Sequence, residues 1–245
     1  MFCACIHVDL SVLGPTPLLV HEHHRTMNPK RFEKLVRALS RRQPDLTVLL
    51  ERVHKSHNLS AILRNCDAVG VLQAHAIPPE DGLQIHSHTS AGTAKWVRLV
   101  RHRTIQGAIH ELKERGFQVL AAHPGPDAID FRKVDYTGPT ALMLGGELLG
   151  LSDEALALAD QRISIPMVGM AQSFNVSVAT ALLLFEAFRQ RQAAQMYDEL
   201  RIDPEESERI LFEWAYPRVA RRYRARGTPY PRLGQDGVLP KISFE

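Results

Sequence analysis

The chain lacks any long apolar segment. No run of about eighteen or more apolar residues, the length that spans a bilayer as a helix, occurs in its 245 residues. Residues 1–26 also lack the basic and continuously apolar regions of a secretory signal. The only cysteines, Cys3, Cys5 and Cys66, are too few and too poorly spaced for a disulfide framework. These absences favour a cytoplasmic protein in a reducing compartment.

Two common kinds of ligand site are missing as well. No expected strand is followed by the glycine-rich fingerprint of dinucleotide-binding folds, which disfavours a Rossmann-like enzyme. Cys3, Cys5 and the three histidines of residues 21–24 could be drawn as a metal site, but their spacing matches no zinc pattern. Incidental histidine clusters are common in tails, so we predict no metal centre.

Positive charge is concentrated in two places, although the formal net charge is only +3. Residues 30–42 form an expected amphipathic helix with six basic residues and one acid, and residues 218–226 hold five arginines without an acid. Such clusters are typical of polyanion-binding surfaces, because each cation placed on a phosphate releases counterions, and they are equally typical of solvated helix faces. The residues that we assign to polyanion binding are Lys30, Arg31, Lys34, Arg41, Arg42, Arg218, Arg221 and Arg222.

Short apolar runs alternate with helical stretches along the middle of the chain. The runs fall at residues 46–50, 71–77, 96–100, 117–122, 141–144 and 163–165. Helices are expected to end near residue 69, to span residues 104–115 and 176–188, and to begin again at Asp203. The helix over residues 176–188 is apolar almost all round, so it should be buried in the protein or against a partner chain. This order predicts an α/β protein with a largely parallel sheet flanked by helices.

Polar or glycine-rich residues follow three of the expected strands. In residues 54–70, Asn58 and Arg64 come where an open parallel sheet binds ligands, although a helix cap and a surface arginine explain this segment better when it is taken alone. In residues 144–154, Gly145 and Gly146 let a ligand approach the backbone, and Glu147 follows them in an uncharged loop.

The third polar segment, residues 163–179, leads a strand into the apolar helix. Ser173 and Asn175 stand at the start of that helix, where polar side chains cap the helix, bind a ligand, or do both.

Taken together and in this order, the three segments resemble the signature motifs of the SpoU/TrmH family of RNA 2′-O-methyltransferases, in the SPOUT superfamily. The resemblance runs from Met27-Asn28-Pro29 to the Pro229-Tyr230-Pro231 region, and within the family it is greatest to enzymes that methylate guanosine in tRNA. Residues 1–26 have no counterpart, and we expect them to be disordered.

The resemblance implies a domain organisation and a reaction. Residues 27–45 should form a basic helix, residues 46–191 a SPOUT domain with a trefoil knot over about 139–191, and residues 192–245 a helical RNA-binding extension. The family works as a homodimer that transfers a methyl group from S-adenosyl-L-methionine to a ribose 2′-hydroxyl. We therefore expect guanosine 18 of tRNA as the substrate.

The resemblance also implies the site. Arg64 should be the catalytic residue and face the cofactor cavity, with Asn58, Glu147, Ser173 and Asn175 completing the set. The residues expected to contact the cofactor are Ala122, Leu144, Gly145, Gly146, Glu147, Ile165, Met167, Ser173, Phe174 and Asn175.

Two questions stay open at the level of sequence. Arg64 as a general base conflicts with a guanidinium pKa above about 12, so the alternative is that it clamps a phosphate while the proton leaves by phosphate or water. The competing functions are methylation of ribosomal RNA, and RNA binding without catalysis on the same fold.

Overall fold

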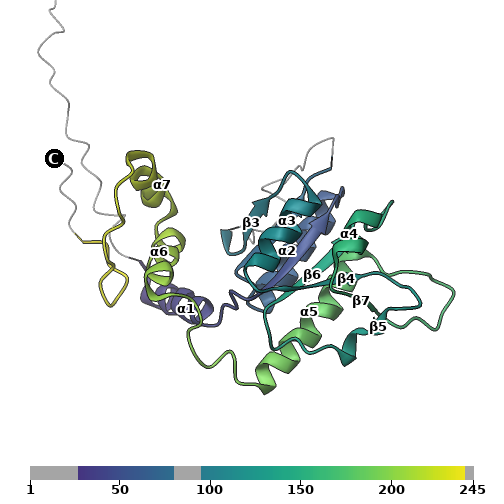
Figure 1. Cartoon of the computed structure of the whole chain (residues 1–245). Coiled ribbons are helices and arrows are strands. Elements are labelled where there is room, and N and C mark those ends of the chain that lie inside the picture. The colour runs from purple at the N-terminus through teal and green to yellow at the C-terminus, as the bar shows by residue number, and fades with distance from the viewer. Residues whose placement is uncertain (1–26, 80–94, 241–245) are drawn as a thin grey trace, which may run out of the picture.

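The structure is a computed structural model that describes residues 27–79 and 95–240. At its centre is a seven-stranded sheet in the order β3-β2-β1-β6-β4-β7-β5, in which neighbouring strands are parallel (Figure 1). The predicted α/β class with a largely parallel sheet is confirmed. The strands are β1 (Leu46–Glu51), β2 (Gln73–Ile77), β3 (Arg98–Arg101), β4 (Gln118–Ala122), β5 (Ile129–Asp130), β6 (Thr140–Gly145) and β7 (Gln161–Ser164).

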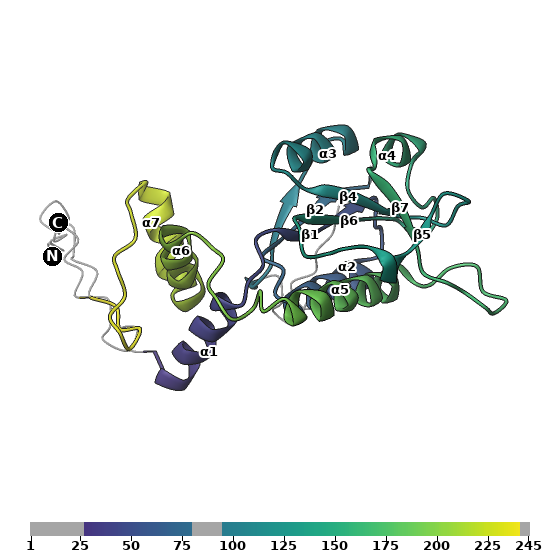
Figure 2. The same cartoon turned by 60° about the horizontal axis from the view of Figure 1, so that its bottom comes forward.

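Helices cover both faces of the sheet. Figure 2 shows α3 (Ile105–Glu114) and α4 (Asp153–Leu158) on one face, and α2 (Ser56–Ala68) and α5 (Val176–Ala193) on the other. Because helices cover both faces of the sheet, every residue of β1 is buried, and the strand is mostly apolar on both sides. Two apolar cores result, one containing Leu59 of α2 and Leu183 of α5, the other Ile109 of α3 and Ala155 of α4.

A second group of helices lies beside the sheet domain (Figure 1). This helical extension consists of α1 (Pro29–Ser40), α6 (Pro204–Ala215) and α7 (Pro217–Arg226). Asn28 and Asp203 cap α1 and α6, and each helix has proline in its first turn, where no backbone hydrogen bond is lost. Leu39 of α1 and Phe212 of α6 belong to a separate apolar core. The extension therefore has a hydrophobic centre of its own.

The predicted strands and helices are present, with bounds shifted by a few residues. The apolar helix is longer than expected and runs to Ala193, and β7 ends at Ser164 rather than at Ile165. The pattern did not predict β5 or the 3₁₀ helix η3 (Phe131–Lys133), because segments this short carry no periodicity. The expected disorder of residues 1–26, with Cys3, Cys5 and the histidines, lies outside the described residues.

Among residues 27–79 and 95–240, no helix is long and apolar enough to cross a bilayer. Within the same ranges no three acidic, histidine or cysteine side chains gather as metal ligands would. Cys66 is fully buried on α2, and burial raises the pKa of its thiol to about 12, so this thiol stays protonated.

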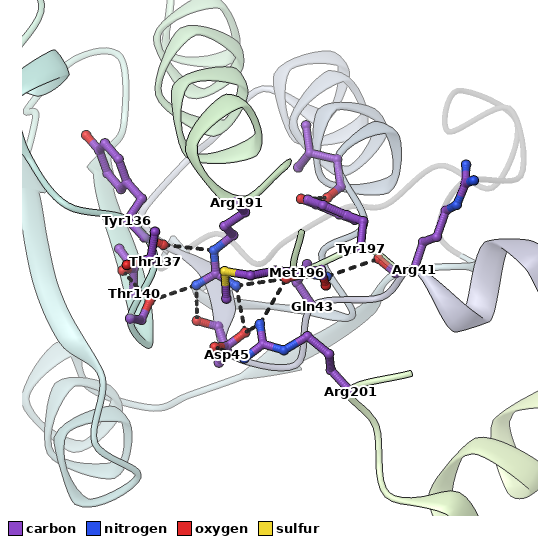
Figure 3. A network of polar contacts seen from close by, with 12 residues as sticks. Arg41, Gln43, Asp45, Tyr136, Thr137, Thr140, Arg191, Met196, Tyr197 and Arg201 are labelled. Atoms are coloured by element: carbon purple, nitrogen blue, oxygen red, sulfur yellow. Dashed lines mark hydrogen bonds and ion pairs between the residues drawn. The ribbon is translucent and has the colours of Figure 1, made fainter. Parts of the chain in front are cut away.

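A buried arginine connects the segments that precede β1 and β6 at the amino-terminal end of the sheet (Figure 3). Arg191, near the end of α5, has no exposed side-chain surface and donates to the carbonyl oxygens of Tyr136 (2.9 Å) and Gly138 (2.7 Å) and to the Asp45 carboxylate (2.6 Å). Arg201 binds the same carboxylate at 3.0 Å from the segment that leads to α6. Asp45, which directly precedes β1, thus connects that strand to α5 and to the segment that leads into α6.

Two stacked histidines lie on the β2–β3 side of the sheet. His75 of β2 is completely buried and accepts a hydrogen bond from the Gln73 amide at Nε2 (2.9 Å), so its Nδ1 carries the proton and donates to His102 (2.7 Å). Burial, together with His102, Arg115 and Arg98, lowers the pKa of His75 to about 4. The folded protein therefore holds a neutral imidazole here.

We expect this imidazole to make stability fall in acid. In the unfolded chain His75 titrates near 6.5, so its contribution is complete above that pH and is lost as the pH falls from 6.5 toward 4. Between pH 7 and pH 4.5 the free energy of unfolding should fall by about 2 kcal/mol more in the wild type than in His75→Gln. Urea denaturation at the two pH values measures this difference, and equal losses would contradict it.

Candidate active site

A cavity of about 780 Å³ opens at the carboxyl ends of β4, β6 and β7. Ligands bind at this edge in open parallel sheets, because the loops that follow the strands converge there. All ten residues predicted to contact the cofactor line this cavity; that they bind it stays a prediction. Sequence reasoning missed four polar lining residues, Lys55, His123, Ser164 and Gln172. His123 directly follows β4, and its position after that strand was the signal that could have found it.

The glycines of the second segment form one wall of the cavity by folding back on the chain. A Cβ atom on Gly145 would lie 2.0 Å from the Gly150 carbonyl carbon, and one on Gly146 would lie 2.1 Å from the Arg52 carbonyl oxygen. The Gly146 N–H donates to the Glu51 carbonyl (2.8 Å), and the Gly150 N–H donates to the Gly146 carbonyl (2.9 Å). No larger residue fits this loop without moving backbone.

The three sequence segments meet through a chain of polar side chains. The Asn58 amide donates to Glu147 Oε1, and the Asn175 amide donates to Asn58 Oδ1 at 3.2 Å. Asn175 Oδ1 in turn accepts from the backbone N–H and the hydroxyl of Ser177 in the first turn of α5 (2.9 and 2.6 Å). Each of the three segments therefore contributes one member of this chain, which we call the Asn58–Glu147–Asn175 chain.

Glu147 is ionised within this chain. Burial works against its charge, but hydrogen bonds from its own backbone, the Asn58 amide and the His54 backbone, with Lys55 nearby, lower the pKa of Glu147 overall. Its second oxygen, Oε2, is buried and has no hydrogen-bond partner within the described parts of the chain. A buried carboxylate oxygen without a partner is costly, so a ligand with a cationic or hydroxyl group is well suited to this wall.

Arg64 lies elsewhere. It is exposed on α2 and does not line the cavity, so the expectation that it faces the cofactor cavity is wrong. The reason is helical geometry: Asn58 and Asn65 are two turns apart and share the face that packs on α5, where the Asn65 amide donates to the Ser177 carbonyl (2.8 Å). Arg64 stands one position off that face. In the described ranges no hydrogen bond or ion pair engages its guanidinium.

The basic residues of the extension divide into two groups. Seven of the eight assigned to polyanion binding are exposed: Lys30, Arg31, Lys34, Arg41, Arg218, Arg221 and Arg222. Arg42 is the exception, because its side chain is only 2% exposed and its guanidinium binds Asp67 and the Val71 carbonyl (2.9 Å). The prediction that Arg42 contacts a polyanion is therefore wrong, and its charge is used inside the protein.

The fold and the site together define a class of protein. It is an α/β enzyme with a glycine-walled cavity at the carboxyl edge of a parallel sheet, and its basic helical extension is suited to a polyanionic substrate. Residues 45–185 match the SpoU rRNA Methylase family, and residues 189–241 match the family described as SpoU, rRNA methylase, C-terminal. The chain belongs to the SpoU methylase family, which confirms the resemblance found in the sequence.

Two similar proteins carry the same activity in their names. The chain is 50% identical over 215 residues to the tRNA (guanosine(18)-2′-O)-methyltransferase of Escherichia coli K12, covering 87% of this chain and 94% of that protein. It is 56% identical over 190 residues to the enzyme of the same name from Thermus thermophilus, covering 78% and 98%.

Similar solved structures belong to the same family. The A. aeolicus TrmH/SpoU tRNA modifying enzyme is 44% identical, with a TM-score of 0.73 over 78% of this chain and 97% of that one. The SpoU methyltransferase AviRb from Streptomyces viridochromogenes, in complex with AdoMet, is 27% identical, with a TM-score of 0.56 over 62% of each chain.

Proposed function

We propose that this protein transfers a methyl group from S-adenosyl-L-methionine to the ribose 2′-hydroxyl of guanosine 18 in tRNA. The observation that carries the proposal is the Asn58–Glu147–Asn175 chain, which joins the three signature segments beside the cavity. Relatives at 50% and 56% identity bear that activity in their names and are matched over nearly their whole length. Intact polar residues in all three segments argue against the catalytically silent alternative.

The cavity fits the methyl donor in volume and in chemistry. About 780 Å³ lies within the usual range for ligand sites, and the Gly145–Gly146 wall leaves backbone groups open to close approach. When bound, the cofactor supplies an electrophilic methyl group on a sulfonium. The unpartnered Glu147 oxygen would then face a positively charged ligand, and the cavity walls at Leu144, Ile165 and Phe174 would enclose its apolar parts.

The chain's own residues orient the acceptor, and the proton that the hydroxyl loses would leave by phosphate or water. In-line placement of the hydroxyl is the main task, and Asn175 suits that role because it lines the cavity and is held in place by the buried Asn58. Arg64 is exposed and unengaged in the described structure, so its guanidinium can reach a phosphate of bound RNA. A guanidinium gives up a proton poorly, and we therefore assign Arg64 to binding a phosphate of the RNA, which would orient the hydroxyl through the RNA backbone.

The helical extension is the proposed RNA-binding region. The seven exposed basic residues lie on α1 and α7 or directly after α1, outside the cavity domain. Exposed lysine and arginine side chains bind phosphates without reading sequence, and shape then selects the folded RNA.

A purified-protein assay tests the function. Unmodified tRNA and ribosomal RNA are each incubated with the enzyme and a methyl-labelled donor, and ribose methylation is mapped to single nucleotides. We expect incorporation at guanosine 18 of tRNA. Label only in ribosomal RNA would favour the alternative substrate, and no label in either RNA would favour the silent RNA-binding protein.

We also propose that the protein is a homodimer. Val178, Leu182 and Phe185 are spaced by four and three residues on α5, and these apolar side chains are 44%, 38% and 50% exposed. The opposite side of α5 is buried against its own domain, so a partner chain best explains why the helix is apolar all round. Val176 and Ala179 in the first turn of the same helix line the cavity, so the start of α5 reaches the site.

Charge on this face should separate the dimer. Phe185→Glu places a carboxylate where a two-fold interface would bury it twice, so we expect the mass measured by light scattering to fall to that of one chain. Ile129→Glu is the matched control, because Ile129 is an exposed apolar residue (37%) on β5. A wild-type protein that is already monomeric at micromolar concentration would refute the dimer.

Two further expectations follow from family membership. We propose the trefoil knot over about residues 139–191, and a cytoplasmic location, where tRNA is available and the Cys66 thiol stays reduced. Pulling a single molecule from both ends tests the knot, because a knotted chain stays shorter than its full extended length. Fractionation of cells tests the location.

A further inference from the structure

Arg42 lies at a junction between the helical extension and the sheet domain. It follows α1, and its guanidinium binds Asp67 in the last turn of α2 and donates to the Val71 carbonyl at 2.9 Å. The same guanidinium lies 5.1 Å from the centroid of the Trp214 ring on α6. One side chain, 2% exposed, thus contacts both α2 and α6. We call this set, with Trp96, the Arg42 junction, since Trp96 packs edge-on against Trp214 at 5.3 Å.

The position of Asp67 favours a cation beside it. A carboxylate in the last turn of a helix opposes the helix dipole, whose carboxyl end is already negative. Arg42 compensates this charge, and Asp67 remains one-third exposed (34%) while Arg42 is buried. The contact therefore stabilises one end of α2 at the point where the extension meets it.

Helix α2 connects this junction to the site. Asn58 lies in its first turn and joins Glu147 and Asn175, whereas Asp67 lies in its last turn. Arg64 is three residues before Asp67, on an adjoining part of the helix surface. Because Asn58 is held at the site end of α2 by Glu147 and Asn175, a shift of the other end at Arg42 displaces chiefly Arg64.

We propose that Arg42 is a positioning residue that fixes α2 relative to the helical extension, so that RNA held by the extension meets Arg64 in the correct register. The inference rests on the proposed function, since it assumes that the extension binds the RNA. It assigns Arg42 a role different from that of its neighbour Arg41, which is exposed and available to phosphate.

The kinetic test compares charge changes at the junction with matched changes elsewhere. Asp67→Asn keeps an acceptor for Arg42 but removes the charge, and Arg42→Lys keeps the charge but cannot make both contacts. At saturating tRNA we expect each to lower kcat by about tenfold or more, with the Kd for S-adenosyl-L-methionine unchanged, because a shift near 1 Å is enough to misalign the reacting groups.

The controls separate positioning from RNA contact and from charge alone. Arg41→Ala should raise the KM for tRNA and leave kcat unchanged. Glu206→Gln removes a carboxylate from the exposed Arg209 pair on α6 and should change neither value. A double variant, Arg42→Lys with Asp67→Asn, should lose no more activity than the worse single variant, because both act through one contact.

Fluorescence gives a readout independent of activity. The chain has two tryptophans, Trp96 and Trp214, and both belong to the Arg42 junction. We expect Asp67→Asn to shift the emission maximum of the folded protein, and Arg41→Ala to leave it unchanged. If Arg42→Lys fails to fold, Asp67→Asn decides alone, since its side chain is partly exposed.

The outcomes are distinguishable. The positioning role is overturned if Asp67→Asn keeps the wild-type kcat, or if it loses cofactor binding in proportion to activity, which would indicate a general loss of structure. Failure of the proposed function is a different result: the wild type would then transfer no methyl group to tRNA, whatever the junction variants do.

Discussion

Arg64→Ala should abolish methyl transfer while leaving cofactor binding intact. The guanidinium is exposed on α2 and does not line the cavity, so its removal takes nothing from the walls around the methyl donor. It does remove the cation proposed to hold a phosphate beside the reacting hydroxyl, a loss worth about a hundredfold or more in kcat. Single-turnover methylation of tRNA and calorimetric titration with S-adenosyl-L-methionine measure the two quantities separately.

A second substitution at the same position distinguishes the two roles of the arginine. Arg64→Lys keeps a positive charge that can pair with a phosphate, so a clamp should retain part of the rate, although without bidentate geometry. A general base would instead make the rate of Arg64→Lys rise with pH, because lysine loses its proton near a pKa of about 10.4. An Arg64→Ala enzyme with wild-type kcat would refute the assignment of Arg64 altogether.

The contrast between Arg64 and Asn58 shows how far the sequence reaches. The positions of the strands along the chain, the three polar segments and their meeting point were predictable, because parallel strands end at one edge and each motif follows a strand. The direction of a side chain on α2 was not. Asn58 faces α5 and Arg64 faces outward because the helix packs through the Asn58 and Asn65 face, and that choice depends on tertiary contacts.

Arg42 shows a second limit. In the sequence it is one of six cations on a basic helix and looks the same as Arg41. Its partners, Asp67 and Trp214, lie 25 and 172 residues away, and no local pattern links them to it. The charge clusters therefore located an exposed basic surface, whose binding of a polyanion stays a prediction, but could not separate the members that face solvent from the one that is buried.

The loop at Gly146 should tolerate no side chain, not even a methyl group. In Gly146→Ala the new Cβ would lie 2.1 Å from the Arg52 carbonyl oxygen and 2.9 Å from its carbon, so backbone must move. Arg52 has little freedom to yield, since it already has a φ of 51°, a left-handed conformation that disfavours a side chain. Displacing the loop breaks the hydrogen bond from Gly146 to Glu51 and carries Glu147 away from Asn58.

The expected result is a loss of cofactor affinity larger than the loss of stability. We expect the Kd for S-adenosyl-L-methionine in Gly146→Ala to rise by about a hundredfold, because the wall and the Glu147 carboxylate move together, while unfolding loses about 1–3 kcal/mol from overpacking. Titration calorimetry and thermal unfolding measure the two effects. Gly138→Ala is the matched control, because a Cβ there meets no atom within 4 Å and should leave the Kd unchanged. Wild-type affinity in Gly146→Ala would show that the glycine wall does not contact the cofactor, and the binding site would then have to be sought on the opposite side of the cavity, along residues 163–167.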